Sequence, residues 1–119
     1  MSKLGIGWID LTVDDAEGLR SFYVSVTGLA PSAASMGAYD DYVLSVPQGD
    51  SVAGVCHRRG GNASGPTGWI VYFTVPDLDA AIAAADEGGG KLIGGPSNGI
   101  AFMQDPDGNH FALYHAPSD

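Results

Sequence analysis

Basic residues are scarce in this chain. Five Lys and Arg stand against 14 Asp and Glu among 119 residues, giving a formal net charge of −9 at pH 7. Such a charge repels phosphate backbones, so we expect no nucleic-acid partner. The surplus of carboxylates would suit a cationic ligand, although most acidic side chains of a domain simply face solvent.

Cysteine and long apolar runs are scarce too. Cys56 has no partner in the chain, which excludes an internal disulfide framework and fits a reducing compartment. The first residues lack the apolar run of a signal peptide, and no apolar stretch approaches transmembrane length. We therefore expect a cytoplasmic protein that does not contact a membrane.

The length and the glycine content indicate one compact domain rich in turns. A chain of 119 residues is long enough for one hydrophobic core and too short for two ordinary domains. The 18 glycines are about double the usual share. We predict a single domain over residues 1–119.

The order strand, helix, strand, strand, strand occurs twice. In the first copy an alternating strand over 7–13 precedes a helix that Asp14 or Asp15 can cap and Gly28 can end. Leu19, Phe22, Tyr23 and Val26 have the spacing of one apolar helix stripe. Short apolar runs near 32–37, 41–46 and 51–57 predict three antiparallel strands.

The second copy follows a Gly- and Pro-rich connector over 58–68. Adding 62 takes Thr12 to Thr74 and Gly28 to Gly90, whereas the final strands match at an offset of 59. We predict two modules, at about 4–57 and 69–116. Strands are expected over 69–75, 91–95, 99–104 and 109–116, with an alanine-rich helix over 80–87.

This duplication and the final turn and strand resemble the vicinal oxygen chelate superfamily, which includes glyoxalase I, bleomycin-resistance proteins and extradiol dioxygenases. The strongest likeness is Asp-Pro-Asp-Gly-Asn-His-Phe-Ala-Leu-Tyr at 105–114, and the similarity covers about 7–115. The resemblance implies an α+β fold in which two βαβββ modules form an eight-stranded, incompletely closed mixed sheet around a cavity. It also implies a homodimer.

In metal-dependent members of that superfamily, His or Glu ligands occupy set positions on the first and last strand of each module. Those positions map onto Trp8, Ala53, Ile70 and Ala112 in this sequence. None of these side chains can coordinate a divalent ion. We therefore expect no metal and no other cofactor.

If the ligand positions mark the inward face, alternation assigns every second residue to the cavity. The expected binding residues are Trp8, Asp10, His57, Tyr72 and Tyr114, and Cys56 is expected to point away. Asp10 and His57 are the catalytic candidates, with Asp10 orienting the imidazole and His57 acting as general base. Alternatively, Asp10 bonds a neighbouring hydroxyl, His57 is structural and the aromatic residues are core.

The function that fits best is binding of a small aromatic or amphipathic molecule without the metal of the superfamily. The alternative is a lyase, isomerase or dioxygenase-type enzyme of the same superfamily. A third possibility, a non-catalytic module that binds a protein partner, predicts a filled cavity.

Overall fold

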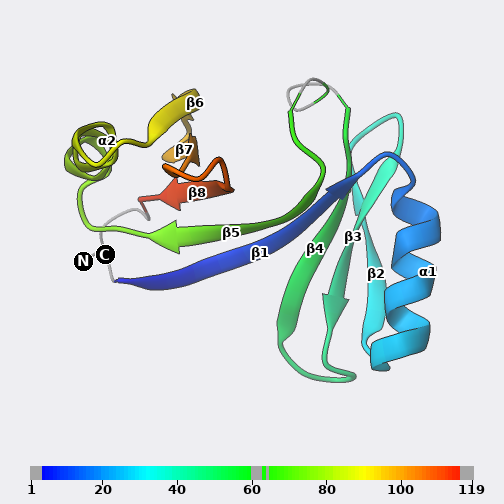
Figure 1. Ribbon diagram of the computed structural model, residues 1–119. Coiled ribbons are helices and arrows are strands. Elements are labelled where there is room, and N and C mark those ends of the chain that lie inside the picture. The colour runs from blue at the N-terminus through cyan, green and yellow to red at the C-terminus, as the bar shows by residue number, and fades with distance from the viewer. Residues whose placement is uncertain (1–3, 60–62, 64, 116–119) are drawn as a thin grey trace. The chain divides into compact units, whose positions relative to one another are not determined.

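The structure is a computed structural model that describes residues 4–59, 63 and 65–115 (Figure 1). It is α+β, with two helices and an eight-stranded mixed sheet that is not closed, as the resemblance implied. The elements, in chain order, are β1 (Gly5–Val13), α1 (Ala16–Thr27), β2 (Ala30–Ser35), β3 (Asp40–Ser45), β4 (Ser51–His57), β5 (Gly68–Thr74), α2 (Leu78–Glu87), β6 (Lys91–Ser97), β7 (Ile100–Gln104) and β8 (His110–Tyr114). Neither helix is long and apolar enough to cross a membrane.

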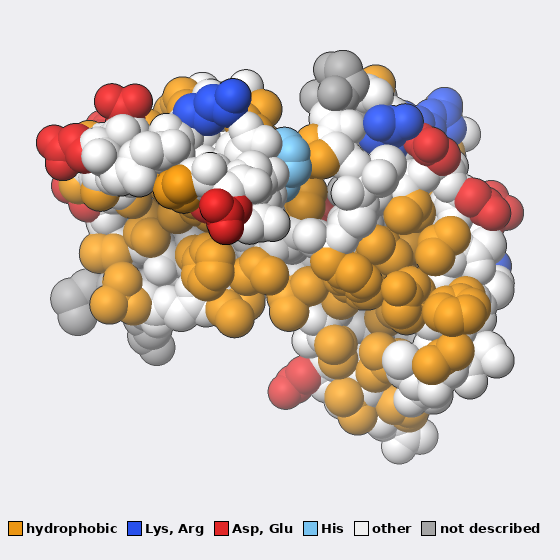
Figure 2. Space-filling view, in the orientation of Figure 1, with side chains coloured by type: hydrophobic (Ala, Val, Ile, Leu, Met, Phe, Trp, Pro, Cys, Tyr) orange, Lys and Arg blue, Asp and Glu red, His pale blue; other side chains and the backbone are white. Residues whose placement is uncertain are grey.

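The chain separates into two compact units. The N-terminal unit is Trp8–Trp69, and the C-terminal unit comprises the described residues of Met1–Gly7 and Ile70–Asp119. Apolar side chains reach the surface of both units (Figure 2). The predicted cavity concerns both units together and stays a prediction, as does the homodimer.

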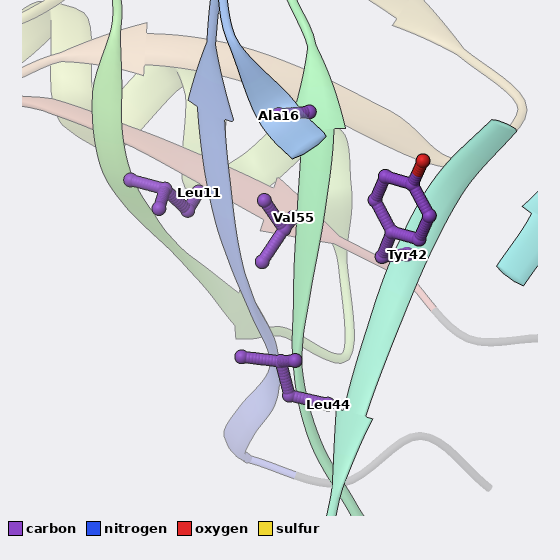
Figure 3. Packing of buried hydrophobic residues seen from close by; sticks show 5 residues of the cluster. All are labelled: Leu11, Ala16, Tyr42, Leu44 and Val55. Carbon is purple, nitrogen blue, oxygen red and sulfur yellow. The ribbon is translucent and has the colours of Figure 1, made fainter. Parts of the chain in front are cut away.

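In the N-terminal unit the strand order is β2-β3-β4-β1, with β1 parallel to β4 and the other pairs antiparallel. Helix α1 covers one face of this sheet. A buried apolar cluster lies between them because alternate strand residues face the helix (Figure 3). Its members are Leu11, Ala16, Tyr42, Leu44 and Val55.

Helix α1 begins and ends where the sequence predicted. The Asp15 carboxylate accepts a hydrogen bond from the Gly18 N–H at 2.9 Å, so Asp15 rather than Asp14 is the N-cap. Gly28 ends the helix in the left-handed region, at φ 78°, where a side chain would be strained. Asp14 instead bonds the Arg58 guanidinium through both carboxylate oxygens, at 3.0 and 3.3 Å.

The predicted apolar stripe of α1 was wrong for two of its four members. Leu19 and Tyr23 pack against the core, but Phe22 and Val26 are 57% and 66% exposed. Val24, the residue after Tyr23, also packs against the core. The buried face of α1 is therefore rotated from the predicted stripe toward Val24. The spacing alone does not reveal this rotation, because apolar residues both precede and follow Tyr23 in the sequence.

The C-terminal unit repeats this plan. Its strand order is β5-β8-β7-β6, with β5 parallel to β8 and the other pairs antiparallel. Helix α2 begins two residues earlier than expected, at Leu78, because the Asp77 carboxylate accepts from the Ala80 N–H at 3.0 Å. Ala101, Met103 and Leu113 form the buried cluster, and Leu78 and Ile82 of α2 pack against it.

An irregularity on β4 has no counterpart on β8. Leu44 of β3 pairs with Ala53 of β4, but the next pair is Ser45 with Ser51, so Val52 is an extra residue on β4. Such a bulge reverses the alternation of side chains on either side of it. Strand β8 pairs with β7 without a shift.

Candidate functional site

The bulge decides which side chains of β4 lie beside those of β1. In a sheet, paired residues on neighbouring strands point to the same face. Asp10 pairs with Gly54 and Thr12 with Cys56, whereas Leu11 pairs with Val55 in the cluster under α1. We call the sheet face away from α1 the Asp10 face; it carries Trp8, Asp10, Thr12, Gly54 and Cys56.

The inward positions predicted for β4, which follow by alternation from Ala53 to Val55 and His57, are therefore wrong. Val55 is fully buried on the α1 side, and Ala53 belongs to the same alternation set. Cys56, expected to point away, lies on the Asp10 face. The error has a physical cause: the extra residue at Val52 changes the offset between the copies from 59 to 58 beyond it, so that Gly54 corresponds to Ala112.

Asp10 forms a hydrogen bond with Cys56, not with a Thr or Tyr hydroxyl. The thiol donates to Asp10 Oδ1, with 3.1 Å between Sγ and Oδ1. Burial, and secondarily the charge of Asp41, raise the pKa of the Asp10 carboxyl, while the bond from Cys56 lowers it. Burial also raises the pKa of the Cys56 thiol, and the carboxylates of Asp10 and Asp41 raise it further.

Gly54 makes room for the polar group of Asp10. A Cβ atom at Gly54 would clash with Asp10 Oδ1 and would lie 3.2 Å from the indole Nε1 of Trp8. The carboxylate and the indole therefore meet above the Gly54 backbone. A carboxylate, a thiol and an indole nitrogen thus converge on one patch of the Asp10 face.

His57 is held by Asp41 and not by Asp10. The Asp41 Oδ1 atom accepts the backbone N–H of His57 at 2.9 Å and lies 3.1 Å from its Nδ1. His57 pairs with Val13, so strand alternation places it outside the Asp10 set. The predicted pairing, in which Asp10 orients the imidazole, is wrong because Asp10 already bonds Cys56.

The two predicted tyrosines belong to the C-terminal unit. Tyr72 pairs with Ala112 and Thr74 with Tyr114, so these residues share one face. Phe102 pairs with Ala112 on the same face, and its ring centroid lies 6.1 Å from that of Tyr72, edge to face. We call this the Tyr72 face. A pocket joining it to Trp8, Asp10 or His57 stays a prediction.

The residues at the metal positions of the superfamily do not fit a metal ion. With the corrected register these positions are Trp8, Gly54, Ile70 and Ala112, and none offers a side-chain donor. In the described parts of the chain, no group of three or more His, Cys, Asp or Glu residues is arranged to hold a metal.

Three residues of these sites were not predicted from the sequence. Asp41 was missed because it lies within an apolar run. A carboxylate beside Tyr42 in a predicted strand nevertheless signals that the carboxylate needs a partner. Gly54 and Phe102 were missed because their positions depend on strand pairing. Phe102 could have been found from the alternation of β7 once its partner strand was known.

Comparisons with known proteins agree on the family. Residues 5–113 match the model of the Glyoxalase/Bleomycin resistance protein/Dioxygenase superfamily. A Mycobacterium tuberculosis protein named "Putative glyoxylase CFP32" is 32% identical over 111 residues, which are 89% of this chain and 42% of that protein. The anthracycline biosynthesis protein DnrV of Streptomyces peucetius is 30% identical over 112 residues, which are 91% and 40% of the two chains.

The chain thus spans about two fifths of the length of the curated relatives it matches. Solved structures share the fold at low identity. A glyoxalase/bleomycin resistance protein/dioxygenase superfamily member from Vibrio splendidus matches with a TM-score of 0.60 at 17% identity, covering 96% of this chain and 100% of that one. Methylmalonyl-CoA epimerase from Mycobacterium tuberculosis matches with a TM-score of 0.57 at 19% identity, covering 95% and 89%. This chain belongs to the Glyoxalase/Bleomycin resistance protein/Dioxygenase superfamily.

Proposed function

We propose that this protein binds a small aromatic or amphipathic organic molecule through its sheet, without a metal ion. The observation that carries the proposal is the chemistry at the metal positions of the superfamily. An indole, a glycine, an isoleucine and an alanine stand there, as Trp8, Gly54, Ile70 and Ala112. These residues can contact an organic molecule but cannot ligate an ion.

Aromatic side chains on the Asp10 face and on the Tyr72 face support an aromatic ligand. The Trp8 indole is half-buried on the Asp10 face, and Tyr72 and Phe102 meet edge to face in the C-terminal unit. Phe102 remains 38% exposed. Because these rings are already held on strands, they lose little conformational freedom when a ligand binds. They are therefore suited to stacking or edge contacts with a planar molecule.

A protonated amine on the ligand would complement the Asp10 face. The only polar side-chain partner of Asp10 among the described residues is the neutral Cys56 thiol, and Asp41 adds a second negative charge nearby. Two of the relatives are named anthracycline biosynthesis proteins. Anthracyclines combine a planar fused ring system with an amine, so we take this chemical class as the first ligand to test.

The test is calorimetric titration of the purified chain with doxorubicin, a planar aromatic amine. Trp8→Ala removes the indole from the Asp10 face and is expected to weaken binding about tenfold, which corresponds to about 1.4 kcal/mol. Trp69→Ala is the matched control. The ring centroid of Trp69 lies 5.4 Å from that of Tyr23 on α1. Loss of the Trp69 indole should therefore leave the affinity for doxorubicin unchanged.

A second titration uses anthraquinone-2-sulfonate, which has planar rings but a negative charge. The acidic face predicts weaker binding of this anion than of doxorubicin. The proposal fails if neither compound binds, or if Trp69→Ala weakens binding as much as Trp8→Ala does.

A further inference from the structure

His57 has the geometry of an oriented proton acceptor. Its backbone N–H and its Nδ1 both contact the same Asp41 oxygen, at 2.9 and 3.1 Å. The side chains of His57 and Asp41 are only 15% and 10% exposed. Because an ionised carboxylate only accepts hydrogen bonds, Nδ1 carries the proton, and the lone pair of the neutral ring is on Nε2.

The Nε2 atom is available to a bound molecule. Among the described residues, the ring of His57 has no hydrogen-bond partner other than Asp41. No buried side-chain nitrogen or oxygen in the described parts of the chain lacks a partner. No described residue bonds Nε2, which leaves this atom to a ligand that donates a hydrogen bond.

Tyr39 and Arg59 form the surroundings of the imidazole. The Tyr39 ring lies edge-on to the His57 ring, with 5.3 Å between centroids and an interplanar angle of 80°. The Arg59 guanidinium lies 3.9 Å from the centroid of the same Tyr39 ring. Arg59 therefore adds a positive charge near the ring, in addition to the negative charge of Asp41, and can help to stabilise a ligand that becomes an anion.

We propose that His57 accepts a proton from an organic molecule with an acidic hydroxyl, of the phenol or enol class. The O–H bond breaks, an N–H bond forms at Nε2, and the products are an imidazolium and an oxyanion. No electron transfer or co-reactant is needed. Asp41 is a positioning residue, because it fixes the ring and stabilises the imidazolium without touching the ligand.

The His57 site lies outside the Asp10 face, although the charge of its Asp41 also acts on Asp10. Its failure would not affect the proposed binding there, because neither His57 nor Trp8 is shared by the two sites. It also differs from the superfamily's metal chemistry, since neither His57 nor Asp41 stands at a metal position of the superfamily.

The first measurement is the nitrogen-15 NMR signature of the His57 ring in the full chain, assigned with a His57→Gln variant. The wild type is expected to show the Nδ1–H tautomer when the ring is neutral. Asp41→Asn is expected to shift the ring toward the Nε2–H tautomer, because an amide can also donate to Nδ1. An Nε2–H tautomer in the wild type would overturn the proposal, even if the Asp41 variant does not fold.

The second measurement uses 4-nitrophenol, whose anion is yellow and therefore reports its own deprotonation. Excess wild-type protein is expected to increase the fraction of anion at a fixed pH. His57→Gln should reduce this effect about tenfold or more, since an ionic hydrogen bond is lost. The control is His110→Gln, which alters an exposed histidine on β8 and should behave like the wild type.

A response that survives His57→Gln, or no response in the wild type, would contradict the proposal. If His57 is merely structural, the 4-nitrophenol absorbance is expected to be unchanged by every variant. The absorbance and the tautomer therefore distinguish a proton acceptor from a ring that only ends strand β4.

Discussion

The Cys56 thiol donates a hydrogen bond to the Asp10 carboxylate across 3.1 Å, on the face of the sheet opposite α1. The bond joins β4 to β1 and places two titratable groups against each other in a partly buried environment. It gives Asp10 a partner and holds the thiol in its protonated form. The reactivity of Cys56 and the pH dependence of stability that arises from Asp10 both follow from this arrangement.

Cys56 should react slowly with thiol reagents in the folded protein. Burial and the neighbouring carboxylates raise the pKa of the thiol, so little thiolate is present at neutral pH. We expect slow alkylation by iodoacetamide, measured by mass spectrometry, and faster alkylation of Asp10→Asn because one negative charge is removed. The urea-unfolded wild type is the control, and equal rates in folded and unfolded protein would contradict the assignment.

Asp10 should make stability fall as the pH rises through its folded pKa. Its pKa is raised from 3.8 in the folded state, chiefly by burial, so the folded protein holds the proton more tightly than the unfolded chain does. The resulting stabilisation is full below the unfolded pKa and is lost above the folded one. Asp10→Asn keeps an acceptor for the thiol, so we expect its melting temperature to exceed that of the wild type at about pH 7, with a smaller difference at about pH 3.

The sign of this trend is the decisive feature. If Asp10→Asn were less stable than the wild type at neutral pH, the ionised carboxylate would be stabilising. Asp79→Asn is a suitable control because Asp79 is exposed at the start of α2.

Gly54→Ala should destabilise the N-terminal unit by about 1–3 kcal/mol, because the new Cβ would overlap Asp10 Oδ1. Chemical denaturation measures the cost. Gly94→Ala is the matched control, since a Cβ there would meet Phe102 at an ordinary 3.9 Å. The cost of Gly54→Ala should shrink in an Asp10→Ala background, and an unchanged cost would show that the clash lies elsewhere.

Asp105→Ala should lower the melting temperature by disrupting the turn between β7 and β8. The Asp105 carboxylate accepts hydrogen bonds from the backbone N–H groups of Asp107 and Asn109, at 2.9 Å each. Bonds from the side chain and backbone of Asn109 are the main reasons that the pKa of Asp105 is lowered. Because a lowered pKa stabilises the fold above the unfolded value, the difference between wild type and variant should diminish as the pH falls through the folded pKa. A difference independent of pH would contradict this.

The elements were predictable because their ends carry local signals. Asp15 and Asp77 cap the two helices and Gly28 ends the first, each through contacts within a few residues. These signals, together with the duplicated pattern, also pointed to the family. They act at short range, so the pairing of distant strands is not needed to interpret them.

The faces of the sheet were less predictable. One extra residue at Val52 reversed the alternation of β4, and no turn residue marks that bulge. Asp10 and Trp8 were placed on one strand face correctly relative to each other, but Cys56 was assigned to the wrong set. The contact of Asp41 with His57 joins residues 16 positions apart and depends on the register of β3 against β4.

Metal-free binding is tested most directly by calorimetric titration of the chain with doxorubicin after exhaustive dialysis against a chelator, repeated with added zinc or nickel. An organic ligand bound by Trp8 and its neighbours without an ion predicts the same affinity in both titrations. Binding that appears only after the metal is added would contradict metal-free binding.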